Sequence, residues 1–365
     1  NGTRSNNVIL AKQPPLSHNF SPFLDTRPGV DQNERFKALA GHPGFDRKKL
    51  DGLHSFASPD GIHWKKTSNE PVIPYQQSWS HAFDSQNVSF WSESEQLYIA
   101  YFRTWTHYRA NPGESPELHR ESGWGLRSIS RVTSHDFKNW SDPVAMHPNM
   151  QDEHLYTSQT HPYYRAPHIY VALPSRYVAG RVGAETRDAM QGSTDILFMA
   201  SRAGTTHYER LFTEAFIRPG LDPERWVSRG NYVALNVVPT SETEMSIYHS
   251  SGHRYTLRID GFVSLHAGAA FGEVVTKPLI FSGNKLIVNY STSAAGSLRV
   301  ELQDTTGTPV PGFSLADCPV IVGDTITQHV KWQNNPCLSS LAGKPIRLRF
   351  EMREGDLYSF CFRSN

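Results

Sequence analysis

Hydrophobic and polar positions alternate over much of this chain, in short runs separated by clusters of Gly, Pro, Asn, Asp and Ser. Alternation with a period of two is typical of β-strands that bury one face, and such clusters are typical of the turns between them. More apolar runs, rich in aromatic and β-branched residues, lie at residues 87–91, 96–102, 168–173, 232–238 and 244–248. The pattern predicts an all-β protein built from many short strands.

A unit of strand, polar turn, aromatic residue and strand recurs along the chain. Its copies lie at residues 55–64, 130–140 and 198–208, with a degenerate fourth copy at residues 256–262. Asp and Gly readily adopt the positive φ angles of hairpin turns. The turn residues of the four copies are Asp60, Asp136, Gly204 and Asp260.

A pair of more apolar strands precedes the later copies of this unit. Two inner strands followed by two outer strands, repeated at intervals of several dozen residues, are typical of β-propeller blades. We therefore expect a five-bladed β-propeller over residues 1–270. A β-sandwich whose hairpins resemble one another by accident is the alternative.

The pattern changes after about residue 270. Strict alternation of apolar and polar positions there predicts half-buried strands at residues 277–281, 285–290, 297–302, 345–351 and 356–362. We expect a β-sandwich over residues 271–365. It shows no catalytic constellation, so a stabilising or carbohydrate-contacting role is expected for it.

Composition and charge narrow the classes of partner. Hydrophobic residues make up 38% of the chain and charged residues 19%, which argues against helical bundles and coiled coils. The net charge of +1 provides no overall field that would hold nucleic acid or an anionic membrane, and no apolar run is long enough for a membrane span. The sequence leaves localisation open, with a periplasmic or secreted location favoured, and leaves the oligomeric state open as well.

The three cysteines, Cys318, Cys337 and Cys361, lie near the end of the chain without a C-x-x-C pair. They are consistent with one disulfide and a spare thiol, or with three buried thiols, which we favour. No phosphate-binding loop, dinucleotide fingerprint or zinc-binding motif is present, so no cofactor is expected. A structural Ca²⁺ or Na⁺ ion on the propeller axis is compatible with the sequence.

Three carboxylates precede the predicted innermost strands of successive blades: Asp25, Asp84 and Glu153. Residues at these positions of a propeller converge on its axis although they are far apart in sequence. Hydrolysis of a glycosidic bond requires one carboxylic acid and one carboxylate. A lone carboxylate at a strand start is more often a turn cap or a partner for backbone N–H groups, so the three residues together carry the prediction.

Side chains that suit sugar hydroxyls or acidic oxygens are found near the same predicted openings: Arg103, His154, His161, Arg229 and Asn231. Nearby tryptophans could stack on sugar rings. Each polar residue also has a structural reading, as a core histidine or a paired surface arginine. A sulfated or uronic sugar would explain the number of arginines.

Several segments resemble bacterial propeller proteins that are grouped with the fructosidase and arabinofuranosidase-like glycoside hydrolases. They lie at residues 19–25 (NFSPFLD), 34–40 (ERFKALA), 58–64 (SPDGIHW), 153–156 (EHLY), 215–220 (AFIRPG) and 311–318 (PGFSLADC). The resemblance implies five blades, a following β-sandwich and three acidic residues from the first three blades. It implies Asp25 as nucleophile or base, Asp84 as the orienting residue and Glu153 as the general acid.

These observations predict an exo-acting glycoside hydrolase that degrades a plant or algal type oligosaccharide. Whether it retains or inverts depends on the separation of the two carboxyl groups, which the sequence does not give. The alternative is a carbohydrate-binding propeller without catalysis, whose Arg and aromatic side chains capture an acidic or sulfated glycan. An interaction scaffold, with an exposed apolar patch in place of a polar pocket, is a third reading.

Overall fold

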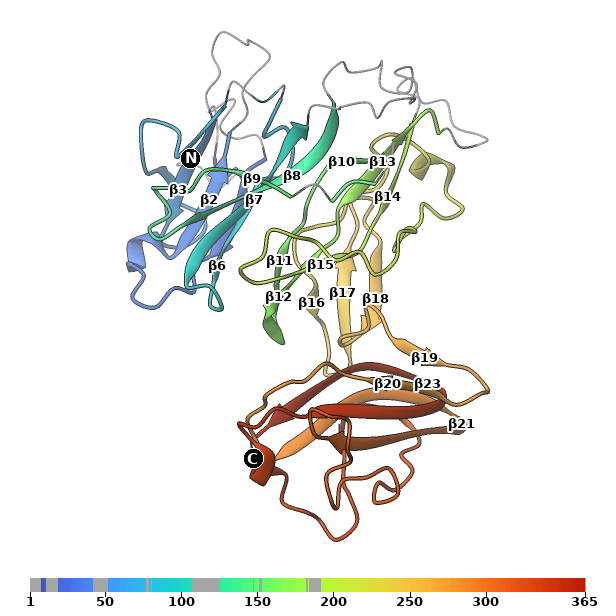
Figure 1. The fold of residues 1–365 in the computed structure, drawn as a ribbon. Helices are drawn as coiled ribbons and strands as arrows, with labels where there is room; N and C mark the ends of the chain where they lie inside the picture. Colours follow the sequence, from blue (N-terminus) through green and yellow to red (C-terminus); the bar gives the residue numbers. More distant parts are fainter. Residues whose placement is uncertain are drawn as a thin grey trace, which may run out of the picture. The chain divides into compact units, whose positions relative to one another are not determined.

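The computed structural model describes residues 8–10, 19–41, 52–76, 79, 81–106, 125–146, 148–150, 153–181, 183 and 192–364. The predicted all-β class is confirmed, because the described chain is built from strands and loops (Figure 1). Its only helical elements there are short 3-10 turns: η1 (Gln32–Glu34), η4 (Pro223–Arg225) and η5 (Leu338–Leu341). The chain divides into two compact units, the first of Asn1–Val237 with Ile247–Tyr255 and the second of Val238–Ser246 with Thr256–Asn365.

The first unit begins with two antiparallel sheets that share one plan. The first sheet has the order β1-β2-β3-β4, with β5 also paired to β3, and the second has the order β6-β7-β8-β9. The strands of the first are β1 (Ser21–Leu24), β2 (Phe36–Ala40), β3 (Gly52–Ser58), β4 (Lys65–Lys66) and β5 (Ile73–Pro74). Those of the second are β6 (Val88–Ser92), β7 (Leu97–Thr106), β8 (Leu126–Ser134) and β9 (Val144–Ala145).

The next segment forms two three-stranded sheets, β10-β13-β14 and β11-β12-β15. Their strands are β10 (His154–Leu155), β11 (His161–Tyr163), β12 (Ala166–Ala172), β13 (Ser175–Ala179), β14 (Gly192–Ile196) and β15 (Met199–Arg202). Two residues separate β12 from β13 and also β14 from β15. The chain therefore passes directly from one sheet to the other twice, from β12 to β13 and from β14 to β15.

The recurrent turn found in the sequence has the same structure in its first two copies. The Ser58 hydroxyl accepts the N–H groups of Asp60 and Gly61 at 3.3 and 2.9 Å, and Asp60 Oδ1 accepts two further N–H groups. Ser134 and Asp136 make the equivalent bonds in the second copy. The left-handed residues are Gly61 (φ 77°) and Phe137 (φ 63°). In both copies the turn directly follows the third strand of its sheet.

Aromatic side chains fill the core of the first unit. One cluster includes Leu53 and Phe83 with Trp91 and Tyr98, and joins residues of the first and second sheets. Another joins the second sheet to the sheet β11-β12-β15 through Phe90, Tyr101 and Tyr170. Tyr98, Tyr101 and Tyr170 have no exposed surface. The burial explains why a low hydrophobic fraction still supports a core, since each aromatic ring buries a large area.

Strands β16 (Val238–Pro239), β17 (Glu244–Tyr248) and β18 (Arg254–Arg258) form a sheet at which the chain passes from one unit to the other. The second unit also contains β19 (Leu265–Ala267), β20 (Gly272–Val275), β21 (Lys285–Gln303), β22 (Asp324–His329) and β23 (Arg347–Arg363). The sequence pattern predicts four separate strands in the regions that β21 and β23 cover. In the structure each of these two strands is continuous, and a bulge in β21 accommodates the residues between Thr292 and Ser297. A predicted strand at residues 277–281 is reduced to a single bridge between Leu279 and Ile346.

The three cysteines of the second unit are free thiols. Cys318 is buried among the core residues of that unit, and Cys361 is half-buried. The interpretation of three buried thiols is wrong for Cys337, which is exposed on the short turn before η5.

Candidate functional site

A cavity of about 520 Å³ lies in the first unit, and we call it the Asp84 cavity. Four stretches of chain supply most of its lining, three of them at or just before the start of β1, β6 and β11 and the fourth before β16, and Arg103 of β7 completes it. The lining residues are Asn19, Phe20, Ser21, Asp84, Ser85, Gln86, Arg103, Tyr156, Thr157, Gln159, Arg229, Tyr232 and Val233. Segments far apart in sequence therefore meet at one polar site.

Left-handed residues shape three of these stretches. Asn19 has φ 54°, Phe83 φ 62° and Gln159 φ 53°. Such a conformation is rare for a bulky residue such as Phe and is held by its surroundings. Here the Asn19 amide donates to the carbonyl oxygen of Phe83 at 3.3 Å, and the Gln159 amide donates to that of Val233 at 2.6 Å. The amides thus tie neighbouring stretches together around the cavity.

Asp84 is the only carboxylate among the described lining residues. Its side chain is 43% exposed, whereas that of its ion-pair partner Arg103 is 2% exposed. His81 Nε2 lies 3.6 Å from the same carboxylate oxygen. Burial lowers the pKa of Arg103 to about 10, with the nearby charge of Arg127 acting in the same direction and Asp84 opposing it. The cavity therefore presents an accessible carboxylate that a buried guanidinium holds in place.

Three aromatic side chains, Trp105, Tyr156 and Tyr177, pack around Arg127 next to this ion pair, and we call them the aromatic wall. The Arg127 guanidinium carbon lies 4.1 Å from the ring centre of Trp105 and 4.7 Å from that of Tyr156, which lines the cavity. His154 Nδ1 accepts the Arg127 backbone N–H at 3.2 Å, and the His154 ring packs on Trp105 and Tyr177. Burial lowers the pKa of Arg127 as well. Tyr156 is thereby held in place by a cation on one side.

Arg229 and Tyr232 complete the cavity from the fourth stretch. Arg229 is exposed, and burial raises the pKa of the Tyr232 hydroxyl to about 12. Between them, Asn231 is fully buried and points elsewhere: its Oδ1 accepts from Arg225 at 3.0 Å and its amide donates to the carbonyl of Thr194 at 2.7 Å. Asn231 therefore supports the stretch that carries Arg229 and Tyr232.

Asp25 does not line the cavity. Its side chain has no exposed surface and lies 3.0 Å from the Lys37 ammonium, while Tyr98 donates to it at 2.6 Å. Asp25 follows β1, whereas the cavity residues Asn19 and Phe20 precede that strand. The strand thus carries Asp25 away from the opening and into the aromatic core.

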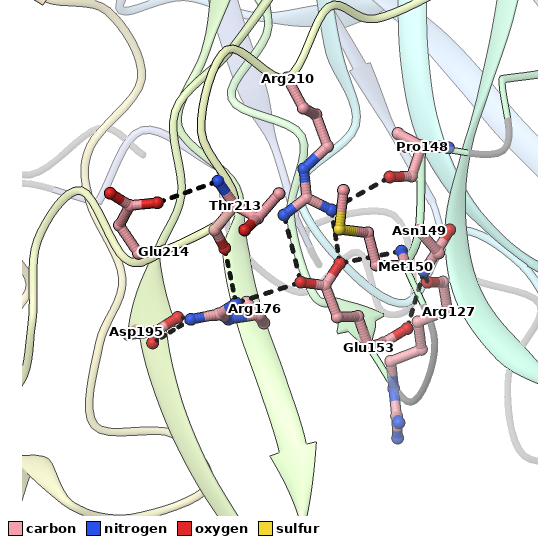
Figure 2. A network of polar contacts seen from close by, with 10 residues as sticks. All are labelled: Arg127, Pro148, Asn149, Met150, Glu153, Arg176, Asp195, Arg210, Thr213 and Glu214. Atoms are coloured by element: carbon pink, nitrogen blue, oxygen red, sulfur yellow. Dashed lines mark hydrogen bonds and ion pairs between the residues drawn. The ribbon is translucent and has the colours of Figure 1, made fainter.

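Glu153 is also absent from the cavity lining and is the centre of a buried ion-pair network (Figure 2). Arg210 bonds both of its carboxylate oxygens, at 2.6 and 3.1 Å, and Arg176 bonds one of them at 3.1 Å while also pairing with Asp195. Burial alone would raise the pKa of Glu153, but the bonds from Arg210, Met150 N–H and Arg176 outweigh it and lower the pKa. A carboxylate kept ionised in this way is poorly suited to donate a proton.

A second cavity of about 530 Å³ is lined by later residues of the same four stretches, among them Phe23, Trp91, Tyr163 and Asn236. His161 lies here and not at the Asp84 cavity. Its Nδ1 donates to the carbonyl of Gln159 at 2.9 Å and its Nε2 accepts the N–H of Val237 at 3.2 Å. Burial lowers the pKa of His161 to about 4, so the ring is neutral.

The structure thus brings together Asp84, Arg103 and Arg229 from the predicted set, with His154 behind the aromatic wall. It places Asp25, Glu153, His161 and Asn231 outside the lining of the Asp84 cavity. No group of three or more His, Cys, Asp or Glu that could hold a metal occurs within the described ranges. In the same ranges no helix is long and apolar enough to cross a membrane.

Comparison with known proteins gives distant structural likenesses. No family model matches the chain, and no curated protein matches it. A glycoside hydrolase family 43 arabinoxylan arabinofuranohydrolase from Bacillus subtilis is similar at 11% identity and a TM-score of 0.32, over 90% of this chain and 76% of that one. A family 32 β-fructofuranosidase from Bombyx mori is similar at 9% identity and a TM-score of 0.37, over 92% and 81%.

An N-acetylgalactosamine deacetylase from F. plautii is also similar, at 12% identity and a TM-score of 0.32, over 92% of this chain and 89% of that one. Likeness at these TM-scores transfers no residue roles. The solved structures that this chain resembles thus include glycoside hydrolases of families 43 and 32.

Proposed function

We propose that this protein binds a carbohydrate in the Asp84 cavity, on a five-bladed β-propeller of residues 1–270 that a β-sandwich of residues 271–365 follows. The observation that carries the proposal is the lining of the cavity. Hydroxyl, amide, guanidinium and carboxylate groups there can exchange hydrogen bonds with sugar hydroxyls, and the rings of Tyr156 and Tyr232 offer apolar faces.

The course of the four lining stretches supports the propeller. Residues at the start of each stretch line the Asp84 cavity, and later residues of the same stretch line the second cavity. All four therefore run in the same direction from one cavity to the other. Innermost strands that surround a common axis are the arrangement that a propeller requires.

Hydrolysis of a glycosidic bond is the second candidate, and the accessible carboxylate of Asp84 favours it. Two carboxyl groups take part in most such reactions. Asp25 and Glu153, the other members of the predicted set, are buried and paired with cations. We therefore give them positioning roles in the fold and base the catalytic candidate on Asp84 alone.

Calorimetric titration with a panel of neutral and acidic oligosaccharides, combined with chromatography of the same samples for cleavage products, tests both candidates. Replacing Asp84 by Asn should weaken binding at least about tenfold, because hydrogen bonds to a charged group contribute about 1.5–3 kcal/mol. Asp142→Asn, at an exposed position outside the cavity, is the matched control. Binding without products supports a carbohydrate-binding protein, whereas products that disappear with Asp84→Asn support hydrolysis. Absence of binding across the whole panel would contradict the proposal.

A further inference from the structure

Among the described residues around the Asp84 cavity, positive charges outnumber negative ones. Arg103 and Arg229 line it and Arg127 stacks behind its Tyr156 wall, while Asp84 is the one carboxylate among the described lining residues. Arg103 is the cation that pairs with Asp84. Within the described chain, neither Arg127 nor Arg229 has a carboxylate at ion-pair distance. Among the described residues these two guanidinium groups are therefore left without a negative partner.

Arg127 and Arg103 are close enough to act on one another. The charge of Arg127 lowers the pKa of Arg103, and Asp84 acts on both guanidinium groups in the opposite sense. Both lie against the same ring, with guanidinium carbons 4.7 and 5.6 Å from the centre of Tyr156. Burying like charges together is unfavourable unless an anion compensates them. One carboxylate compensates only part of this charge.

Arg229 differs from the other two in being exposed, and its side chain makes no hydrogen bond to any described residue. A guanidinium group presents a planar fork of donors that matches the oxygens of a carboxylate or sulfate. The Arg229 guanidinium lines a cavity whose described residues already carry excess positive charge. This arrangement is expected where a protein recognises an anion. The guanidinium is available to a ligand without breaking a hydrogen bond to any described residue.

We propose that the ligand of the Asp84 cavity carries an anionic group, the carboxylate of a uronic sugar or the sulfate of a sulfated sugar, which accepts hydrogen bonds from Arg229 in the field of Arg103 and Arg127. This inference rests on the proposed carbohydrate-binding function and specifies its ligand class. Asp84 then accepts hydrogen bonds from the sugar hydroxyls, because its negative charge would repel the anionic group of the ligand.

The test compares oligosaccharides of equal length that differ only in charge. The full chain is titrated calorimetrically with a neutral galactose oligosaccharide, a galacturonic acid oligosaccharide and a sulfated galactose oligosaccharide, each at low and at high NaCl concentration. At least one acidic ligand should bind about tenfold or more tightly than the neutral one, since a hydrogen bond between charged groups contributes about 1.5–3 kcal/mol. Salt should reduce this preference through screening.

Arg229→Gln should remove most of the preference for the acidic ligand, because it removes the charged donor fork that faces the anion. Arg202→Gln, at an exposed position of β15 outside the cavity, is the matched control. Inorganic sulfate, titrated alone into both variants, measures the anion site without a sugar.

The outcomes separate the two proposals. Preference for the galacturonic acid ligand indicates a carboxylate and preference for the sulfated one indicates a sulfate ester, and either supports the inference. Equal binding of neutral and acidic ligands overturns the anionic ligand and leaves the carbohydrate-binding function standing. Sulfate binding that depends on Arg229, without binding of any oligosaccharide, supports the anion site and overturns the carbohydrate.

Discussion

Arg210 donates to both carboxylate oxygens of Glu153, at 2.6 and 3.1 Å, in a network that excludes solvent from all but 7% of either side chain (Figure 2). The bidentate pair is joined by Arg176, which connects it to Asp195 on β14. Such geometry fixes the chain before β10 against the strands that follow it. Glu153 thus fixes the chain before β10 and lies outside the lining of the Asp84 cavity.

Replacing Glu153 by Gln should therefore destabilise the fold by about 3 kcal/mol, because it leaves the buried Arg210 without its carboxylate. Urea denaturation monitored by tryptophan fluorescence measures this loss. Glu214→Gln is the matched control, since Glu214 is exposed and accepts only one neighbouring N–H, from Thr213. A Glu153→Gln protein with wild-type stability and abolished oligosaccharide cleavage would instead place Glu153 in catalysis.

Asp25 is expected to respond in a similar way. Asp25→Asn leaves the nearly buried Lys37 ammonium with only Glu34, 3.3 Å away and partly exposed, and should cost about 3 kcal/mol in the free energy of unfolding. The double variant Asp25→Asn/Lys37→Met removes both buried charges, so it should recover a large part of that loss. Both are measured by urea denaturation. If the double variant is no more stable than the single one, the buried ion pair does not explain the role of Asp25.

Much of the local fold could be predicted from the sequence because its signals are local. The Ser-x-Asp turns at Ser58 and Ser134 depend on hydrogen bonds within a few residues, and they occur in the structure where the repeat predicts them. The long strand β21 could not be predicted in one piece. Its bulge is set by the register with β23, a partner more than forty residues away, and alternation alone does not encode that register.

The candidate site could likewise be predicted only where local sequence signals place a residue. Asp84 could be found by position because it lies just before the inner strand β6, and the structure places it in the cavity lining. Asn19 and Gln159 each lie two residues before an inner strand but were not predicted, because in the sequence a polar amide there resembles an ordinary turn residue. Whether a carboxylate at a strand end is exposed or sealed depends on partners such as Lys37 and Arg210, which come from other parts of the chain.

His161 predicts a specific loss of stability in mild acid. Its pKa is about 4 in the folded chain because it is buried, and about 6.5 when unfolded, so the unfolded state binds the extra proton between these values. Stability is therefore complete above about pH 6.5 and falls as the pH drops towards 4, by up to about 3 kcal/mol. Urea midpoints measured from pH 7 to pH 4.5 test this.

His161→Gln should flatten the pH dependence in that window, although the fold will be weaker at pH 7 because the bonds to Gln159 and Val237 are altered. His135→Gln, at an exposed histidine, is the control and should leave the slope unchanged. Equal slopes in wild type and His161→Gln would show that the His161 ring accepts a proton in the fold.

Gly192 on β14 tests whether the aromatic wall positions Tyr156 for ligand binding. A Cβ atom at this position would come 2.1 Å from the Tyr177 ring, whose centre lies 5.4 Å from that of Tyr156. Gly192→Ala should therefore displace Tyr177, lower stability by about 1–3 kcal/mol as overpacking does, and weaken oligosaccharide binding severalfold in the protein that remains folded. Gly268→Ala, where a Cβ meets open space, is the control. Calorimetry and urea denaturation on the same samples separate the two effects. Loss of stability with unchanged affinity would mean that Tyr156 keeps its place without Tyr177.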